Sequence, residues 1–285
     1  MKSGIHVAVA AGAFVARLSL ADPFTAGSPS APAAETLALP GAANTLGTHG
    51  ARWRSDLSIR NPGNDPIEVR VLFLRAGQPN DVASAPHKDF FLISGEVKEI
   101  RNVLGAEIGV TGTGVLIVSA SRLVFPNNPA GASVSAVMRT ASPLLLAPGD
   151  SGSGISPAEP TDAARQAVAL RHDGVGEKGL RGAVGAVNLS RKDWLKLRVE
   201  YVDKDGEVLA EKELHLPPLS SAQQASPVRL AKGSARLTRI EGAGPFIAYA
   251  TTVDNSAGDA TFTYATPEPG QPAAVRPLSF GALAE

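Results

Sequence analysis

Apolar and polar residues alternate along several short stretches of the chain, a pattern typical of β-strands with one buried face. Every second residue is apolar from Ile67 to Phe73, and again from Leu195 to Tyr201. Helical periodicity is scarce, and the one helix-like stretch, residues 161–170, fits equally well a short strand over 167–171. Further strand-like segments begin at Lys88, Gly114, Val134, Lys212, Gly233 and Phe246. The pattern predicts an all-β fold.

The strand-like segments occur as two similar series. Arg54 and Asn61 stand seven residues apart and enclose small or apolar residues in alternation, and Arg181 and Asn188 do the same. After each block, four strand-like segments follow in the same order and at similar spacing. We therefore predict an internal duplication, with these four residues as its structural markers.

Turn-forming residues separate the strands and set the predicted boundaries. Asp205-Gly206 predicts a tight hairpin, because this dipeptide readily adopts positive φ. We expect two tandem Ig-like β-sandwich domains joined by a Pro/Gly/Ser-rich linker. The predicted segments are a linker at 22–34, the first sandwich at 35–147, the inter-domain linker at 148–163, the second sandwich at 164–268 and a C-terminal tail at 269–285.

The first residues have the features of an export signal. Lys2 is followed by an uncharged apolar run from Ile5 to Ala16, and Ser19-Leu20-Ala21 offers small residues at a cleavage site. The run is too short to span a bilayer. We expect a signal peptide at 1–21, an exported protein of the cell surface or extracellular space, and no membrane span after cleavage.

Composition narrows the function classes. Lys and Arg number 27 and Asp and Glu number 27, so the net charge is zero and argues against a nucleic-acid partner. With no cysteine in the chain, each predicted sandwich depends on its apolar core instead of disulfides. Glycine (29) and proline (22) are abundant, which agrees with many turns.

The repeat blocks resemble a tandem β-sandwich module of large secreted proteins of soil bacteria. The first copy matches at Leu39-Pro40, at Trp53 to Leu57 and at Asn61-Pro62-Gly63. The second matches at Ala248 to Ala250 and in the turn from Val253 to Asp259. The resemblance covers about residues 35–268 and implies an extracytoplasmic structural or interaction module. It carries over no catalytic residues, and Ala183 stands where the first copy has Asp56.

Gly149-Asp150-Ser151-Gly152 matches the tetrapeptide around the nucleophile of chymotrypsin-like proteases. That chemistry needs a histidine base and an acid to orient it, and none of the histidines stands in the expected setting. The tetrapeptide also falls in the predicted linker. A serine hydrolase around Ser151 is therefore a remote alternative.

Calcium is the one metal that the sequence favours, because carboxylates and amides gather in turns. Asp254, Asn255 and Asp259 could converge on one turn, although Asx-turn hydrogen bonding explains the same residues without a metal. The turn at residues 203–207 is better explained as a plain hairpin. No other cofactor is expected.

The two tryptophans are the candidate ligand-binding residues. Trp53 begins a strand, where core or edge packing is the competing explanation, and Trp194 follows a charged turn that favours exposure. Arg54 and Arg181 share a position in the two copies, which favours a common structural role.

Together these observations predict a non-enzymatic extracellular module that binds protein partners or self-associates in a surface, matrix or filament assembly. A glycan- or small-ligand-binding module is the alternative.

Overall fold

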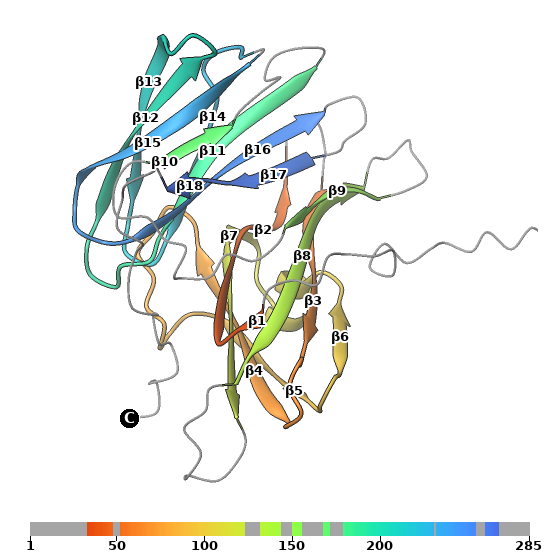
Figure 1. Ribbon diagram of the computed structural model, residues 1–285. Coiled ribbons are helices and arrows are strands. Elements are labelled where there is room, and N and C mark those ends of the chain that lie inside the picture. The colour runs from red at the N-terminus through yellow and green to blue at the C-terminus, as the bar shows by residue number, and fades with distance from the viewer. Residues whose placement is uncertain are drawn as a thin grey trace, which may run out of the picture.

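The computed structural model describes residues 33–47, 52–122, 132–143, 150–155, 168–171, 179–230, 232–254 and 260–267. Antiparallel β-strands make up most of these residues, which confirms the all-β fold (Figure 1). Within the described ranges one helical segment occurs, η2 (Val103–Ile108). The predicted signal peptide and C-terminal tail lie outside them.

Residues 33–155, called the first half below, form two β-layers around one apolar core. One layer contains β5 (His87–Leu92), β4 (Ile67–Arg75), β7 (Gly112–Arg122) and β2 (Thr36–Leu46). The other contains β6 (Val97–Ile100), β3 (Arg52–Arg60) and β8 (Val134–Pro143), with β1 (Ala33–Ala34) and β9 (Asp150–Ile155) paired to β8. The two layers are continuous because β2 pairs with β7 for most of its length and with β3 at its end.

Residues 168–267, the second half, again form two layers. The first contains β13 (Val208–Leu216), β12 (Leu195–Asp203), β15 (Gly233–Glu241), β10 (Val168–Arg171) and β18 (Thr266–Pro267). The second contains β14 (Ser221–Ala225), β11 (Leu180–Asn188), β16 (Phe246–Asp254) and β17 (Ala260–Tyr264). Strand β10 lies where the sequence allowed either a helix or a lead-in strand.

Six antiparallel pairings of the first half recur in the second half in the same order. Pairings β2–β7, β7–β4 and β4–β5 correspond to β10–β15, β15–β12 and β12–β13. Pairings β3–β6, β3–β8 and β8–β9 correspond to β11–β14, β11–β16 and β16–β17. The two halves therefore have the same sandwich-like strand arrangement.

Strand β9 differs from the sequence prediction. Residues 150–155 were expected within a flexible linker, but they pair in antiparallel register with Met138 to Pro143 of β8. Serine and glycine carry no large apolar side chain, so this segment gave no hydrophobic signal. It forms a strand all the same, because backbone hydrogen bonds to a neighbouring strand are enough to hold it.

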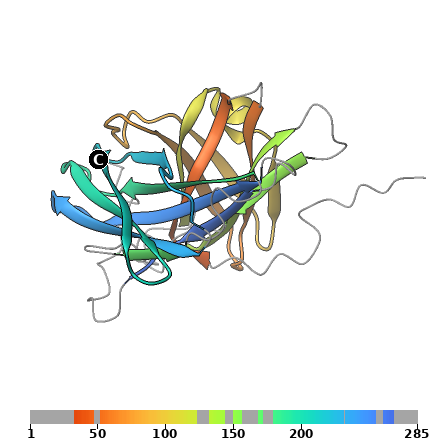
Figure 2. The same ribbon diagram turned by 90° about the horizontal axis from the view of Figure 1, so that it is seen from above.

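A third apolar core joins the halves. The outer face of the β4–β7 layer contributes Leu72, Leu74, Val115 and Ile117, and the outer face of the β11–β16 layer contributes Val187, Ile247 and Tyr249. The molecule is thus a stack of four β-layers with apolar cores between successive layers (Figures 1 and 2).

Hydrogen bonds reinforce this junction at one end of the shared core. The Asn80 side chain donates to the Leu219 carbonyl oxygen at 2.8 Å. The Asn80 backbone N–H donates to the Pro218 carbonyl oxygen at 3.1 Å. The Ser220 hydroxyl donates to the Arg75 carbonyl at 3.0 Å. Backbone groups of both halves take part, so the junction is held by hydrogen bonds as well as by apolar packing.

Candidate ligand-binding cleft between the halves

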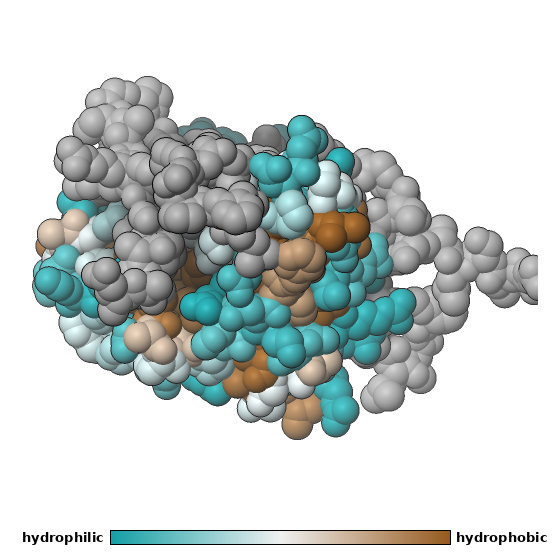
Figure 3. Space-filling model, turned by 90° about the horizontal axis from the view of Figure 1, so that it is seen from below, coloured by the Kyte–Doolittle hydropathy of each residue, from teal (hydrophilic) through white to brown (hydrophobic). Residues whose placement is uncertain are grey.

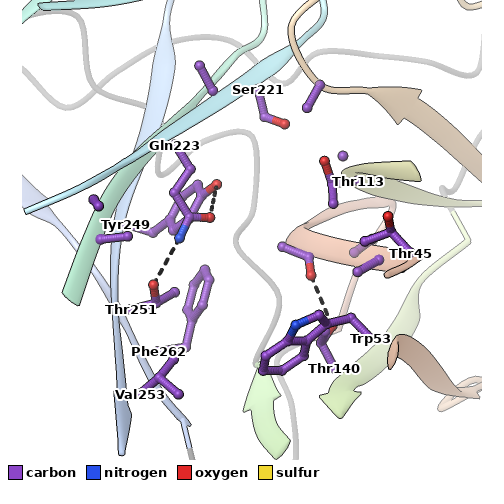
Figure 4. Close-up of a pocket in the computed structure, with 18 of the residues that line it drawn as sticks. Thr45, Trp53, Thr113, Thr140, Ser221, Gln223, Tyr249, Thr251, Val253 and Phe262 are labelled. Atoms are coloured by element: carbon purple, nitrogen blue, oxygen red, sulfur yellow. Dashed lines mark hydrogen bonds between the residues drawn. The ribbon is translucent and has the colours of Figure 1, made fainter. Parts of the chain in front are cut away.

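A cleft of about 670 Å³ opens between the two halves, next to the shared core (Figure 4). The first half supplies residues of β2, β3, β7 and β8, and the second supplies residues of β11, β14, β16 and β17. Its volume lies in the range of small-molecule sites. Neither half could form this cleft alone.

Aromatic rings build the wall from the second half. Tyr249 is only 2% exposed, and its ring stacks on Phe262 with centroids 4.9 Å apart and planes 15° apart. Gly185, the cross-strand partner of Tyr249, has no side chain to obstruct the ring: a Cβ there would lie 2.4 Å from Tyr249 Cζ. The glycine therefore fixes where the aromatic wall stands.

Polar groups on the same wall are held by one another. The Tyr249 hydroxyl donates to Gln223 Oε1 at 3.5 Å, and Gln223 Nε2 donates to Thr251 Oγ1 at 3.0 Å (Figure 4). Burial raises the pKa of Tyr249, because the phenolate would be poorly solvated. The hydroxyl therefore stays protonated and serves as a donor.

A bulge in β2 shapes the wall from the first half. The register shifts between Pro40 and Ala42, and Gly41 adopts a φ of 79°, which favours glycine. Thr140 Oγ1 donates to the Gly41 carbonyl at 3.0 Å, so Ser55 is the donor in its 2.7 Å bond to Thr140.

The Ala43 N–H completes this chain by donating to Ser55 Oγ at 2.8 Å. Each hydroxyl in this series of hydrogen bonds both donates and accepts, which holds the bulge in place beside the cleft.

Trp53 stands between the cleft and a second hollow. It is half-buried in β3, opposite Thr45 of β2, and across the cleft from Phe262 (Figure 4). Trp53 and Thr45 also line the second hollow, of about 570 Å³. The other residues of that hollow are Asn44, Leu46, Arg52, Arg54, Asn102, Thr111 and Gly112. An aromatic side chain therefore joins two neighbouring concave surfaces.

The charges around these hollows have one sign. Among the described lining residues, the charged ones are Arg181 in the cleft and Arg52 and Arg54 in the second hollow. That described lining includes no Asp, Glu, His, Lys or Cys. An acid–base pair or a nucleophile with its base is therefore missing from it, whereas aromatic, hydroxyl and amide groups suit binding.

The two predicted ligand-binding tryptophans are placed differently. Trp53 lines both hollows, whereas Trp194 is 58% exposed, precedes β12 and lines neither. Arg54 and Arg181 occupy equivalent positions of β3 and β11, yet they line different hollows. Tyr249, Phe262 and Gln223 were not identified from the sequence, although Gly185 within a strand is a signal of close approach.

The predicted calcium and serine-hydrolase residues lie mostly outside the part of the chain whose side chains are described. Asp254 ends β16, and Asn255 and Asp259 of the predicted calcium turn lie outside the described residues. Ser151 lies in β9, and its side chain is not described. In the described part of the chain, no three His, Cys, Asp or Glu side chains gather as metal ligands.

Comparison with known proteins gives no match, either to a protein-family model or to a curated sequence. Within the described ranges, no helix has the length and apolarity needed to cross a membrane.

Proposed function

We propose that this chain is a duplicated, exported, non-enzymatic binding module, and that it recognises its partner in the cleft between its halves. The observation that carries the proposal is the lining: aromatic, hydroxyl and amide groups from both halves, without an acid–base pair among the described residues. The shared core supports it, because preorganised walls reduce the entropy lost on binding.

Export is supported by the sequence alone, through the apolar run from Ile5 to Ala16. A serine hydrolase has less support, because the described histidines, His87 and His215, belong to β5 and β13, neither of which pairs with β9.

A binding screen against glycan and peptide arrays tests the proposal. The mature protein is compared with Trp53→Ala and with Trp194→Ala, which removes the same side chain outside the cleft. We expect wild-type signals to persist in Trp194→Ala and to be lost in Trp53→Ala. Signals that survive Trp53→Ala would refute the cleft as the binding site, whatever their dependence on Trp194.

Assembly into filaments by stacking has little support. On the first half, the face that corresponds to the junction face of the second half carries Arg60 opposite Ser135. On the second half, the face that corresponds to the junction face of the first half carries Glu200 opposite Arg236. Both faces are more polar than the junction itself, so they do not reproduce its apolar contact. A structural role through other surfaces is the second candidate, supported by Phe91, Ile93 and Val97, which lie at β5 and β6 and are each more than half exposed. Figure 3 also shows apolar side chains exposed among polar ones on one face.

A further inference from the structure

We infer that the cleft and the second hollow form one track for an acidic saccharide chain, with Trp53 at its centre. The inference rests on the proposed binding function and names the class of ligand. The two hollows share Trp53 and Thr45, so a ligand longer than one sugar ring can lie across both.

Charge selects an anion. Arg181 lines one side of the track and Arg52 the other, and both side chains are exposed. Guanidinium groups bind carboxylates through paired hydrogen bonds in a fixed geometry. The described lining contains no carboxylate that would repel an acidic ligand. The positive charge is local, since the whole chain has zero net charge.

The groups between the arginines select a saccharide. An indole ring packs against the apolar face of a sugar ring, which presents aligned C–H groups, while the sugar edges carry hydroxyls. Thr45 and Thr113 offer hydroxyls and Gln223 an amide, so the track offers both donors and acceptors. An acidic peptide would use the arginines, but it has no corresponding flat polyhydroxylated ring.

Small side chains along the cleft allow a saccharide to approach the protein backbone closely. The residues that line the cleft include Gly41, Ala42 and Ala43 of the first half and Gly182 and Ala183 of the second. Ala183 occupies the position of Asp56 in the first half, so the cleft side carries a methyl group where the equivalent strand carries a carboxylate. This difference favours an anionic ligand in the cleft.

Isothermal titration calorimetry at low salt tests the inference. The probes are hexagalacturonate and hexamannuronate, with their methyl esters as uncharged counterparts and hexaglutamate as an acidic peptide. We expect at least one acidic hexasaccharide to bind and its ester to bind at least about tenfold more weakly, because a charge-assisted contact is lost. Raising NaCl should weaken the binding, since the arginines are exposed.

Variants assign the contacts. Trp53→Ala should weaken binding of the acidic hexasaccharide by about tenfold or more, as for a central aromatic contact. Arg181→Gln should weaken the acidic form and leave the ester unchanged. Trp194→Ala should leave both unchanged and serves as the matched control.

Three results would overturn the inference. The esters could bind as tightly as the acids, hexaglutamate could bind as tightly with the same dependence on Trp53, or neither acidic hexasaccharide could bind. The proposed function fails on a different result, namely array signals that do not depend on Trp53.

Discussion

Asn61 and Asn188 perform the same task in the two halves. Both side chains are fully buried, and each Nδ2 donates to backbone carbonyls of a neighbouring turn and of a strand end. Asn61 contacts Asp65, Leu92 and Ile93 at 2.8, 3.3 and 3.0 Å.

Asn188 contacts Asp193, Leu216 and Pro217 at 2.8, 3.2 and 2.9 Å. Each Oδ1 also accepts the N–H two residues ahead, at 2.9 Å. One amide therefore ties a turn to the end of a distant strand in each half.

Replacing Asn188 by Ala should lower the free energy of unfolding by about 2–3 kcal/mol, because buried carbonyls lose their donor. The measurement is urea denaturation. Asn64→Ala is the control, since Asn64 is exposed in the equivalent turn of the first half and should change little. A loss as small as that of the control would show that water replaces the amide.

The sequence identified these asparagines as repeat markers but could not reveal their role. Four of their six carbonyl acceptors lie about 30 residues away, and the fold alone brings these close. The same holds for the cleft: Trp53 was a candidate, whereas Tyr249 and Phe262 became site residues only because the halves stack.

The contrast between corresponding strands explains how the halves stack. All four residues from Val71 to Leu74 in β4, and from Val115 to Val118 in β7, are buried. In the corresponding strand β12, apolar residues instead alternate with Arg198 and Glu200. A continuous apolar run indicates burial on both faces, so the sequence did contain a signal for the junction. Alternation alone predicted the separate sandwiches and missed the junction.

At the level of strand pairing, Gly185→Ala should destabilise the protein by about 1–3 kcal/mol, because a methyl group overpacks against the Tyr249 ring. Thermal unfolding measures the loss. In the background of Tyr249→Ala the same substitution should cost much less, since the obstructing ring is gone. Equal costs in the two backgrounds would contradict the assigned role of Gly185.

On the scale of the whole molecule, the junction is the one place where two apolar outer faces meet among the described layers. Leu72 opposite Ile117 on the first half faces the second half, where Val187 stands opposite Ile247. At the far face of the second half, the equivalent positions are Glu200 and Arg236, with 3.8 Å between Glu200 Oε2 and Arg236 Nη1. At the far face of the first half they are Arg60 and Ser135. We expect these polar ends to prevent a further unit from stacking on either side.

Placing the apolar residues of the junction at the equivalent positions of both ends should produce open head-to-tail association. The variant carries Glu200→Leu and Arg236→Ile on one end and Arg60→Val and Ser135→Ile on the other. Sedimentation velocity should show a concentration-dependent series of oligomers. Variants with only one end changed should not form this series, and a monomeric fourfold variant would show that the polar ends do not limit stacking.

The two halves should unfold as one cooperative body, because the shared core that joins them also positions both walls of the cleft. Each half contains one of the two tryptophans, so Trp194→Phe leaves a reporter in the first half and Trp53→Phe leaves one in the second. Urea unfolding of these two variants, followed by tryptophan fluorescence, measures whether the halves unfold together. In each variant we expect the fluorescence curve to coincide with the far-UV circular dichroism curve, which reports on both halves, and the two curves to separate when Ile247→Ser weakens the shared core. Two different midpoints within one variant that lacks Ile247→Ser would show that the halves unfold separately.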